Sequence, residues 1–206
     1  MKHIIINIGR QLGSGGHDIG RMLALDFQAK YYDRELLNLA AKESGLSEKI
    51  FEQNDEKKGF FRGLLNLGSP HVSSGRVYNS GVSQESLFQF QSEAIKKAAN
   101  EGSCVFVGRC ADYVLRNLPN TVSVFVTASM DYRVRQIMNK RHLDEDAARK
   151  FIEQGESERA TYYNYYTGKK WGAAESYDLC IDSSVLGLVE TEKIIALFID
   201  FHFCSV

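Results

Sequence analysis

The sequence predicts an α/β protein with a parallel sheet that helices cover on both faces. Two features point to this fold. Short runs of apolar and β-branched residues recur along the chain, and longer stretches with apolar residues at helical spacing separate them. Strand and helix therefore alternate, and alternating elements build parallel sheets because each helix returns the chain to the start of the next strand.

The first elements are clearly marked. Residues 3–9 form an apolar, β-branched run that ends at a glycine, which predicts a buried strand. Apolar residues at helical spacing between 19 and 27 predict a helix that begins near Gly16. Residues 30–33 form a short strand candidate, and Asp33 is placed to cap the helix expected after it.

The rest of the chain continues the alternation. Residues 84–100 have the pattern of a long helix. Three apolar runs predict further strands at 103–107, 121–126 and 178–182. Helical patterns follow these strands at 113–115, 130–140, 144–163 and 188–201.

Composition limits the possible functions. The 206 residues suffice for one domain with a sizeable core, and the net charge of -1 gives no reason to expect a nucleic-acid or membrane surface. No apolar run approaches membrane-spanning length. Because the chain begins with a strand pattern rather than a signal peptide, and its four cysteines lack CxxC spacing, we expect a cytoplasmic protein. Residues 54–83, rich in Gly, Ser and Asn, predict a mobile insertion within a single domain of residues 1–206.

A glycine-rich stretch, RQLGSGGHD, lies between the first predicted strand and the first predicted helix. Glycines at 13, 15 and 16 allow a tight bend, and the backbone N–H groups of such a bend can cradle phosphate at the start of a helix. Its position predicts a phosphate-binding loop.

Neither general phosphate-loop pattern fits this stretch. In the pattern GxxxxGK followed by Ser or Thr, Arg10 stands at the first glycine, Gly16 at the lysine and His17 at the hydroxyl residue. In the dinucleotide pattern GxGxxG, Asp18 replaces the third glycine. Arg10 and Arg21 flank the stretch and could supply the missing cation. A phosphate loop without lysine, a dinucleotide fold and a glycine-rich turn without a ligand all stay open.

Longer motifs make the chain resemble the cytidylate kinase-like family, a divergent branch of the P-loop nucleoside monophosphate kinases. The resemblance covers nearly the whole chain and rests on the loop GRQLGSGG, YYDRELL at 31–37, VGRCADYVL at 107–115 and YYNYYTGKKWG at 162–172. It implies a three-layer P-loop kinase fold with a five-stranded parallel sheet, helices on both faces and a helical lid at about 133–171.

The resemblance also implies an activity and site residues. We expect transfer of the γ-phosphoryl group from ATP, with Mg²⁺, to a nucleoside monophosphate such as CMP or dCMP. Small nucleotides are the expected partners, nucleic acid and membranes are not, and the oligomeric state is not assigned. The implied catalytic residues are Arg10, Arg109 and Arg159. The implied donor-binding residues are Gly13, Ser14, Gly15, Gly16, His17, Asp18 and Arg133. The implied acceptor-binding residues are Asp33, Arg34, Arg109 and Asp112, and no metal ligand is assigned.

The chain departs from the family at Gln11, where glutamate is common. It departs from true cytidylate kinases where tyrosines replace lid arginines and Cys110 replaces an aspartate. A catalytically weak regulatory protein of the same fold, or a kinase for another small-molecule acceptor, is therefore the alternative. A dinucleotide-dependent oxidoreductase is disfavoured by Asp18 and by the shortness of the second strand.

Overall fold

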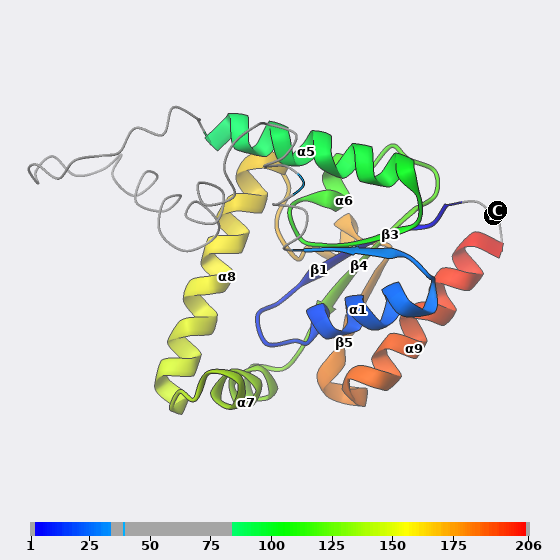
Figure 1. Ribbon diagram of the computed structural model, residues 1–206. Helices are drawn as coiled ribbons and strands as arrows, with labels where there is room; N and C mark the ends of the chain where they lie inside the picture. Colours follow the sequence, from blue (N-terminus) through cyan, green and yellow to red (C-terminus); the bar gives the residue numbers. More distant parts are fainter. Residues whose placement is uncertain (1–2, 34–38, 40–83, 205–206) are drawn as a thin grey trace, which may run out of the picture. The chain divides into compact units, whose positions relative to one another are not determined.

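The protein is described from a computed structural model, which describes residues 3–33, 39 and 84–204 (Figure 1). The chain forms two compact units, one of residues 1–33 with 95–206 and one of residues 34–94. Almost all described residues belong to the first unit, and the site lies within it. The predicted insertion at 54–83 lies outside the described residues, and the single-domain assignment stays a prediction.

The described strands form one parallel sheet in the order β2-β3-β1-β4-β5. Its strands are β1 (Ile5–Arg10), β2 (Lys30–Tyr32), β3 (Cys104–Val107), β4 (Thr121–Thr127) and β5 (Leu179–Asp182). These five strands confirm the predicted ones, with ends that differ by one or two residues.

The described helices are α1 (Gly16–Asp26), α5 (Gln84–Glu101), α6 (Ala111–Val114), α7 (Met130–Arg141), α8 (Glu145–Thr167) and α9 (Ser183–Cys204), with a 3₁₀ turn η2 (Ala174–Ser176). They match the predicted helices that fall on described residues, whereas the helix expected after Asp33 lies outside them except for residue 39. Gly187 has a non-helical backbone inside α9, so the regular part of that helix begins after it, as the sequence pattern indicates. No described helix combines the length and the apolar character needed to cross a membrane.

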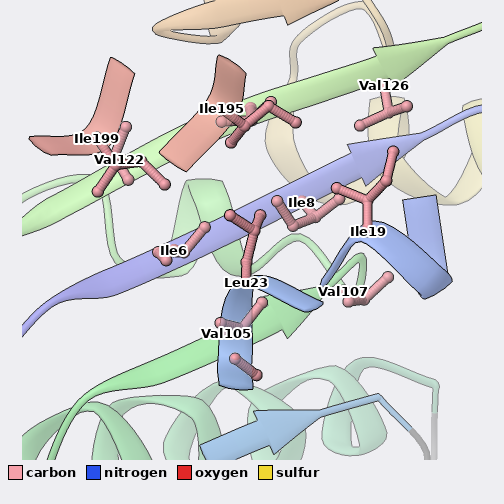
Figure 2. Close-up of a cluster of buried hydrophobic side chains, with 12 residues drawn as sticks. Ile6, Ile8, Ile19, Leu23, Val105, Val107, Val122, Val126, Ile195 and Ile199 are labelled. Carbon is pink, nitrogen blue, oxygen red and sulfur yellow. The ribbon is translucent and has the colours of Figure 1, made fainter. Parts of the chain in front are cut away.

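Helices α1 and α9 cover one face of the sheet, and α6 covers the other (Figure 1). The α1 and α9 face is a close-packed aliphatic layer, in which Ile19 and Leu23 of α1 and Ile195 and Ile199 of α9 meet the β-branched residues of β1, β3 and β4 (Figure 2). Such residues fit a sheet buried on both faces. This layer fixes the start of α1 against the end of β1.

Helices α7 and α8 form a hairpin with a small core of its own. Val134 and Ile137 of α7 pack with Ala148 and Ile152 of α8, and Leu12 from the glycine-rich loop joins them. The hairpin corresponds to most of the predicted lid at 133–171. Its packing onto Leu12 ties the lid region to the loop.

Candidate active site

The carboxyl ends of β1, β2 and β3 meet at one edge of the sheet. β1 ends at Arg10, β2 ends just before Asp33, and β3 ends just before Gly108. Ligands of parallel α/β sheets bind at this edge. The structure therefore brings the predicted loop and two predicted acceptor residues, Asp33 and Arg109, to one edge of the sheet.

Hydrogen bonds from β4 and α9 hold the glycine-rich loop. The backbone N–H of Gln11 donates to the carbonyl of Val126, and the Gln11 side chain accepts from the N–H of Ala128. Ser14 is fully buried, and its carbonyl accepts a hydrogen bond from Ser183 at 2.7 Å. The loop is thus fixed in place by its own fold, before any ligand binds.

The lid hairpin supports the loop from another side. Gly13 has a φ of 86°, and a Cβ there would lie 2.9 Å from the carbonyl oxygen of Arg133. The buried Arg133 side chain donates to the carbonyl of Ala128 and pairs with Glu156 at 2.5 Å. Burial raises the pKa of Glu156, and the Arg133 charge only partly offsets this. Sequence reasoning assigned Arg133 to the donor; its described contacts are with the protein, and a contact with the donor stays a prediction.

The start of α1 lacks a side-chain cap. Gly15, with a φ of 78°, precedes the helix, and among the described residues no side chain caps its first turn. Uncapped N–H groups and the helix dipole both attract negative charge. Asp18, another predicted donor residue, pairs with Lys140 of α7 at 2.9 Å, so its carboxylate already has a cationic partner.

Arg10 lies beside this helix start. Its side chain is only 8% exposed, and its Nη2 lies 3.2 Å from Nε2 of His17. A guanidinium can only donate, so Nε2 is the acceptor of this hydrogen bond, and the other ring nitrogen is Nδ1. That nitrogen lies 2.8 Å from Asp33 and 3.0 Å from the hydroxyl of Tyr31. We call Arg10, His17, Tyr31 and Asp33 the loop cluster.

Asp33 keeps its negative charge within the loop cluster. Burial alone raises the pKa of Asp33, but the hydrogen bond from His17 and the charges of Arg10 and Arg109 outweigh it and lower that pKa. Burial and the charge of Asp33 raise the pKa of Tyr31 to about 12. The carboxylate of Asp33 therefore stays charged because His17 and the nearby charges of Arg10 and Arg109 stabilise it.

The backbone after β3 is unusual. Gly108, Arg109 and Cys110 have φ values of 78°, 62° and 57°. Left-handed backbone is uncommon for residues with a side chain, and such residues gather at functional sites. Arg159 of α8 also reaches this edge, where its Nη1 lies 3.4 Å from the carbonyl oxygen of Arg10.

Asp112 belongs to a separate group of side chains. It accepts a hydrogen bond of 2.6 Å from Tyr163 of α8, and Tyr163 is also hydrogen-bonded to Tyr177. Burial raises the pKa of Asp112 above its ordinary value and raises those of both tyrosines. We call Asp112, Tyr163 and Tyr177 the tyrosine network.

The structure brings most of the predicted site together. The loop residues, Asp33, Arg109 and Arg159 gather at the sheet edge with Arg10, whereas Arg34 lies outside the described residues. Sequence reasoning missed Tyr31, Glu156 and Tyr177. Only Tyr31 had a signal, its place two residues before Asp33.

A magnesium ion held by the protein does not fit these residues. P-loop enzymes hold Mg²⁺ with a loop hydroxyl and a strand-end carboxylate, but here His17 occupies the hydroxyl position and Gly108 and Arg109 follow β3. Imidazole is a poor ligand for this hard cation. In the part of the chain that the structure describes, no three His, Cys, Asp or Glu side chains gather into an all-protein metal site.

Comparisons with known proteins agree with the fold and identify the family. A model of the cytidylate kinase-like family matches residues 5–185. A cytidylate kinase from Methanosarcina acetivorans is 24% identical over 192 residues, which make up 91% of this chain and 92% of that protein.

Two solved structures show the same architecture. An uncharacterized protein from Eubacterium ventriosum has 27% identity and a TM-score of 0.71, with 96% of this chain and 98% of that chain covered. A shikimate kinase from Bacteroides thetaiotaomicron has 11% identity and a TM-score of 0.54, with 96% and 98% covered. The second likeness places the fold among the three-layer P-loop kinases.

Proposed function

The chain belongs to the cytidylate kinase-like family and is a kinase of nucleotides or of another small molecule; on that premise we propose that it transfers the γ-phosphoryl group of ATP to a nucleoside monophosphate, CMP or dCMP. The observation that carries this proposal is the gathering of Arg10, Arg109 and Asp33 at neighbouring strand ends beside the uncapped start of α1.

The donor side of the proposed site is the loop from Arg10 to Asp18. Its backbone N–H groups and the dipole of α1 suit the β- and γ-phosphates of ATP. Arg10 adds a fixed cation at the same place. Because the described residues do not fit a protein-held metal, we propose that Mg²⁺ arrives with ATP, bound to its phosphates and to water.

The acceptor side is formed by residues after β2 and β3. Asp33 is a carboxylate that can accept hydrogen bonds from a base or a sugar. Arg109 can hold the acceptor phosphate in a bidentate manner, as a planar guanidinium does. The two lie close enough for the Arg109 charge to lower the pKa of Asp33.

The reaction itself needs positioning and charge more than covalent help from the protein. An oxygen of the acceptor phosphate attacks the γ-phosphorus of ATP, the bond to the bridging oxygen breaks, and ADP leaves. Arg10, Arg109 and Arg159 are placed to offset the negative charge spread over the transferring group. Arg159 comes from lid helix α8, so lid movement would bring it to the phosphates or withdraw it.

Two alternatives differ in what they predict. A regulatory protein of this fold would bind ATP and transfer nothing, an outcome that the missing loop lysine favours. A kinase for another acceptor would share the donor loop and reject CMP. A cytoplasmic location stays a prediction.

A coupled assay of ADP release across CMP, dCMP, UMP, AMP and small alcohols tests the proposal. We expect CMP or dCMP to give the largest kcat/KM. A larger value for another acceptor would refute the assignment of CMP, and silence across the panel with ATP binding intact would favour the regulatory protein. As a binding control, ATP should raise the melting temperature, and NAD should not.

A further inference from the structure

Arg10 and Gly16 exclude each other sterically. A Cβ built at Gly16 would lie 2.5 Å from Cβ of Arg10 and 2.9 Å from its Cγ. Non-bonded carbon atoms do not pack this closely, so a side chain at position 16 would displace the stem of Arg10 unless position 10 is glycine. The general loop pattern has glycine at the first of these positions and lysine at the second. Here the cation, Arg10, stands at the glycine position, and Gly16 stands at the lysine position.

The guanidinium of Arg10 ends between β3 and α1. A Cβ at Gly108, the first residue after β3, would overlap Nη1 of Arg10, and Nη2 lies 3.2 Å from His17. His17 stands at the hydroxyl position of the loop, and residue 108 follows the strand that carries the metal-binding acid in other P-loop enzymes. The cation therefore lies between the two positions that would otherwise hold Mg²⁺.

Arg10 is buried but incompletely satisfied. It is 8% exposed, and its Nε has no hydrogen-bond partner among the residues that the structure describes. His17, which is itself anchored to Asp33 at 2.8 Å, holds the guanidinium in one orientation. A buried donor without an acceptor costs free energy, and a phosphate oxygen would supply the missing acceptor.

We propose that Arg10, positioned by His17 and Asp33, is the fixed cation for the donor phosphates. It replaces both the loop lysine and the protein-held metal of other P-loop enzymes. Donor binding would then need Arg10 strongly and Mg²⁺ weakly. This inference rests on the proposed use of ATP, but not on the identity of the acceptor.

The first test separates charge from packing. Arg10→Met keeps the aliphatic stem over Gly16 and removes the guanidinium. We expect it to fold and to weaken ATP binding by about tenfold to a hundredfold, as expected for a lost charge-assisted contact. Titration calorimetry measures the affinity, and circular dichroism checks the fold. An unchanged affinity in the folded variant would overturn the proposal.

The second test restores the general pattern. Gly16→Lys alone should unfold or lose ATP binding because the new Cβ overlaps Arg10. Arg10→Gly alone should lose the cation. The double variant R10G/G16K should recover about tenfold or more of the affinity lost in R10G, because lysine can then reach the phosphates. If the double variant binds ATP no better than R10G does, a lysine at position 16 cannot replace Arg10, and the proposal is contradicted.

A steric control does not depend on ATP. Gly16→Ala should lower the melting temperature of the wild type and be tolerated in an Arg10→Gly background, since the nearest obstructing atom is Cβ of Arg10. Equal destabilisation in the two backgrounds would show that the positions do not compete for space.

The last test measures how far ATP binding to the wild-type protein depends on Mg²⁺. ATP affinity measured in Mg²⁺ and in EDTA should differ by less than about threefold if the protein supplies no metal ligand. A gain above about tenfold in Mg²⁺ would indicate protein ligands and overturn this part. These readouts omit the acceptor, so a failed CMP assay with Arg10-dependent ATP binding would refute only the proposed function.

Discussion

The loop cluster and the tyrosine network lie in one compact unit, yet they stabilise a carboxyl group in opposite ways. In the loop cluster, His17 and two arginine charges lower the pKa of Asp33 despite its burial. In the tyrosine network, burial raises the pKa of Asp112, and its hydrogen-bond donors are neutral groups: the hydroxyl of Tyr163 and the backbone N–H groups of residues 112 and 113. The first environment favours charge and the second disfavours it.

This difference indicates that the loop cluster and the tyrosine network have different roles. A site for phosphate needs fixed cations, and only the loop cluster contains them. The tyrosine network joins α6 to α8 through side chains and suits a structural connection to the lid region. The sequence motif that contains both Arg109 and Asp112 thus serves two purposes within four residues.

The largest expected effect comes from removing the cation after β3. Arg109→Asn removes the charge with a residue that tolerates the left-handed backbone there. We expect kcat/KM for the acceptor to fall by about a hundredfold or more, with ATP affinity changed far less. Steady-state kinetics and ATP titration measure the two effects. Equal losses of acceptor use and ATP binding would contradict the assignment of Arg109 to the acceptor.

A smaller effect, on stability, is expected in the tyrosine network. Tyr163 is 5% exposed, so Tyr163→Phe removes one hydrogen-bond donor from the partly buried Asp112, which keeps its bonds from the backbone of residues 112 and 113. The substitution should lower the unfolding free energy by about 1 kcal/mol. Urea unfolding measures this. Tyr165→Phe is the matched control, because Tyr165 is 57% exposed and should change stability little. Equal effects of the two substitutions would show that the Tyr163 hydrogen bond to Asp112 does not stabilise the fold.

The smallest expected effect is on the pH dependence of stability, to which Asp33 and Asp112 contribute with opposite signs. The lowered pKa of Asp33 adds stability above the ordinary value of 3.8, and this contribution is lost as the pH falls through the folded-state pKa. The raised pKa of Asp112 means that the folded state binds more protons than the unfolded state just above 3.8, so stability falls as the pH rises.

The two asparagine variants reveal these signs. From pH 3 upward, Asp33→Asn should become less stable relative to wild type, and Asp112→Asn should become more stable relative to wild type. Unfolding free energies at matched pH values measure both trends. Parallel profiles would show that the two environments do not differ.

The sequence predicted the strands and helices because apolar periodicity is local. The loop was also predictable, from its glycines and its place between β1 and α1. The steric conflict between a side chain at position 16 and Arg10 was not predictable, because only the folded loop places the stem of Arg10 against Gly16. The tyrosine network was hidden as well: Asp112 and Tyr163 are 51 residues apart. Arg133 looked like a lid cation until its partner Glu156, 23 residues on, was known.

The most direct test of the proposed activity follows the phosphoryl group itself. The protein is incubated with CMP and with ATP that carries radioactive phosphorus at its γ position, and the nucleotides are separated by chromatography. Phosphoryl transfer to CMP predicts label in CDP, in step with ADP formation and lost in Arg109→Asn. Label that stays in ATP, or appears only as free phosphate, would contradict a cytidylate kinase activity.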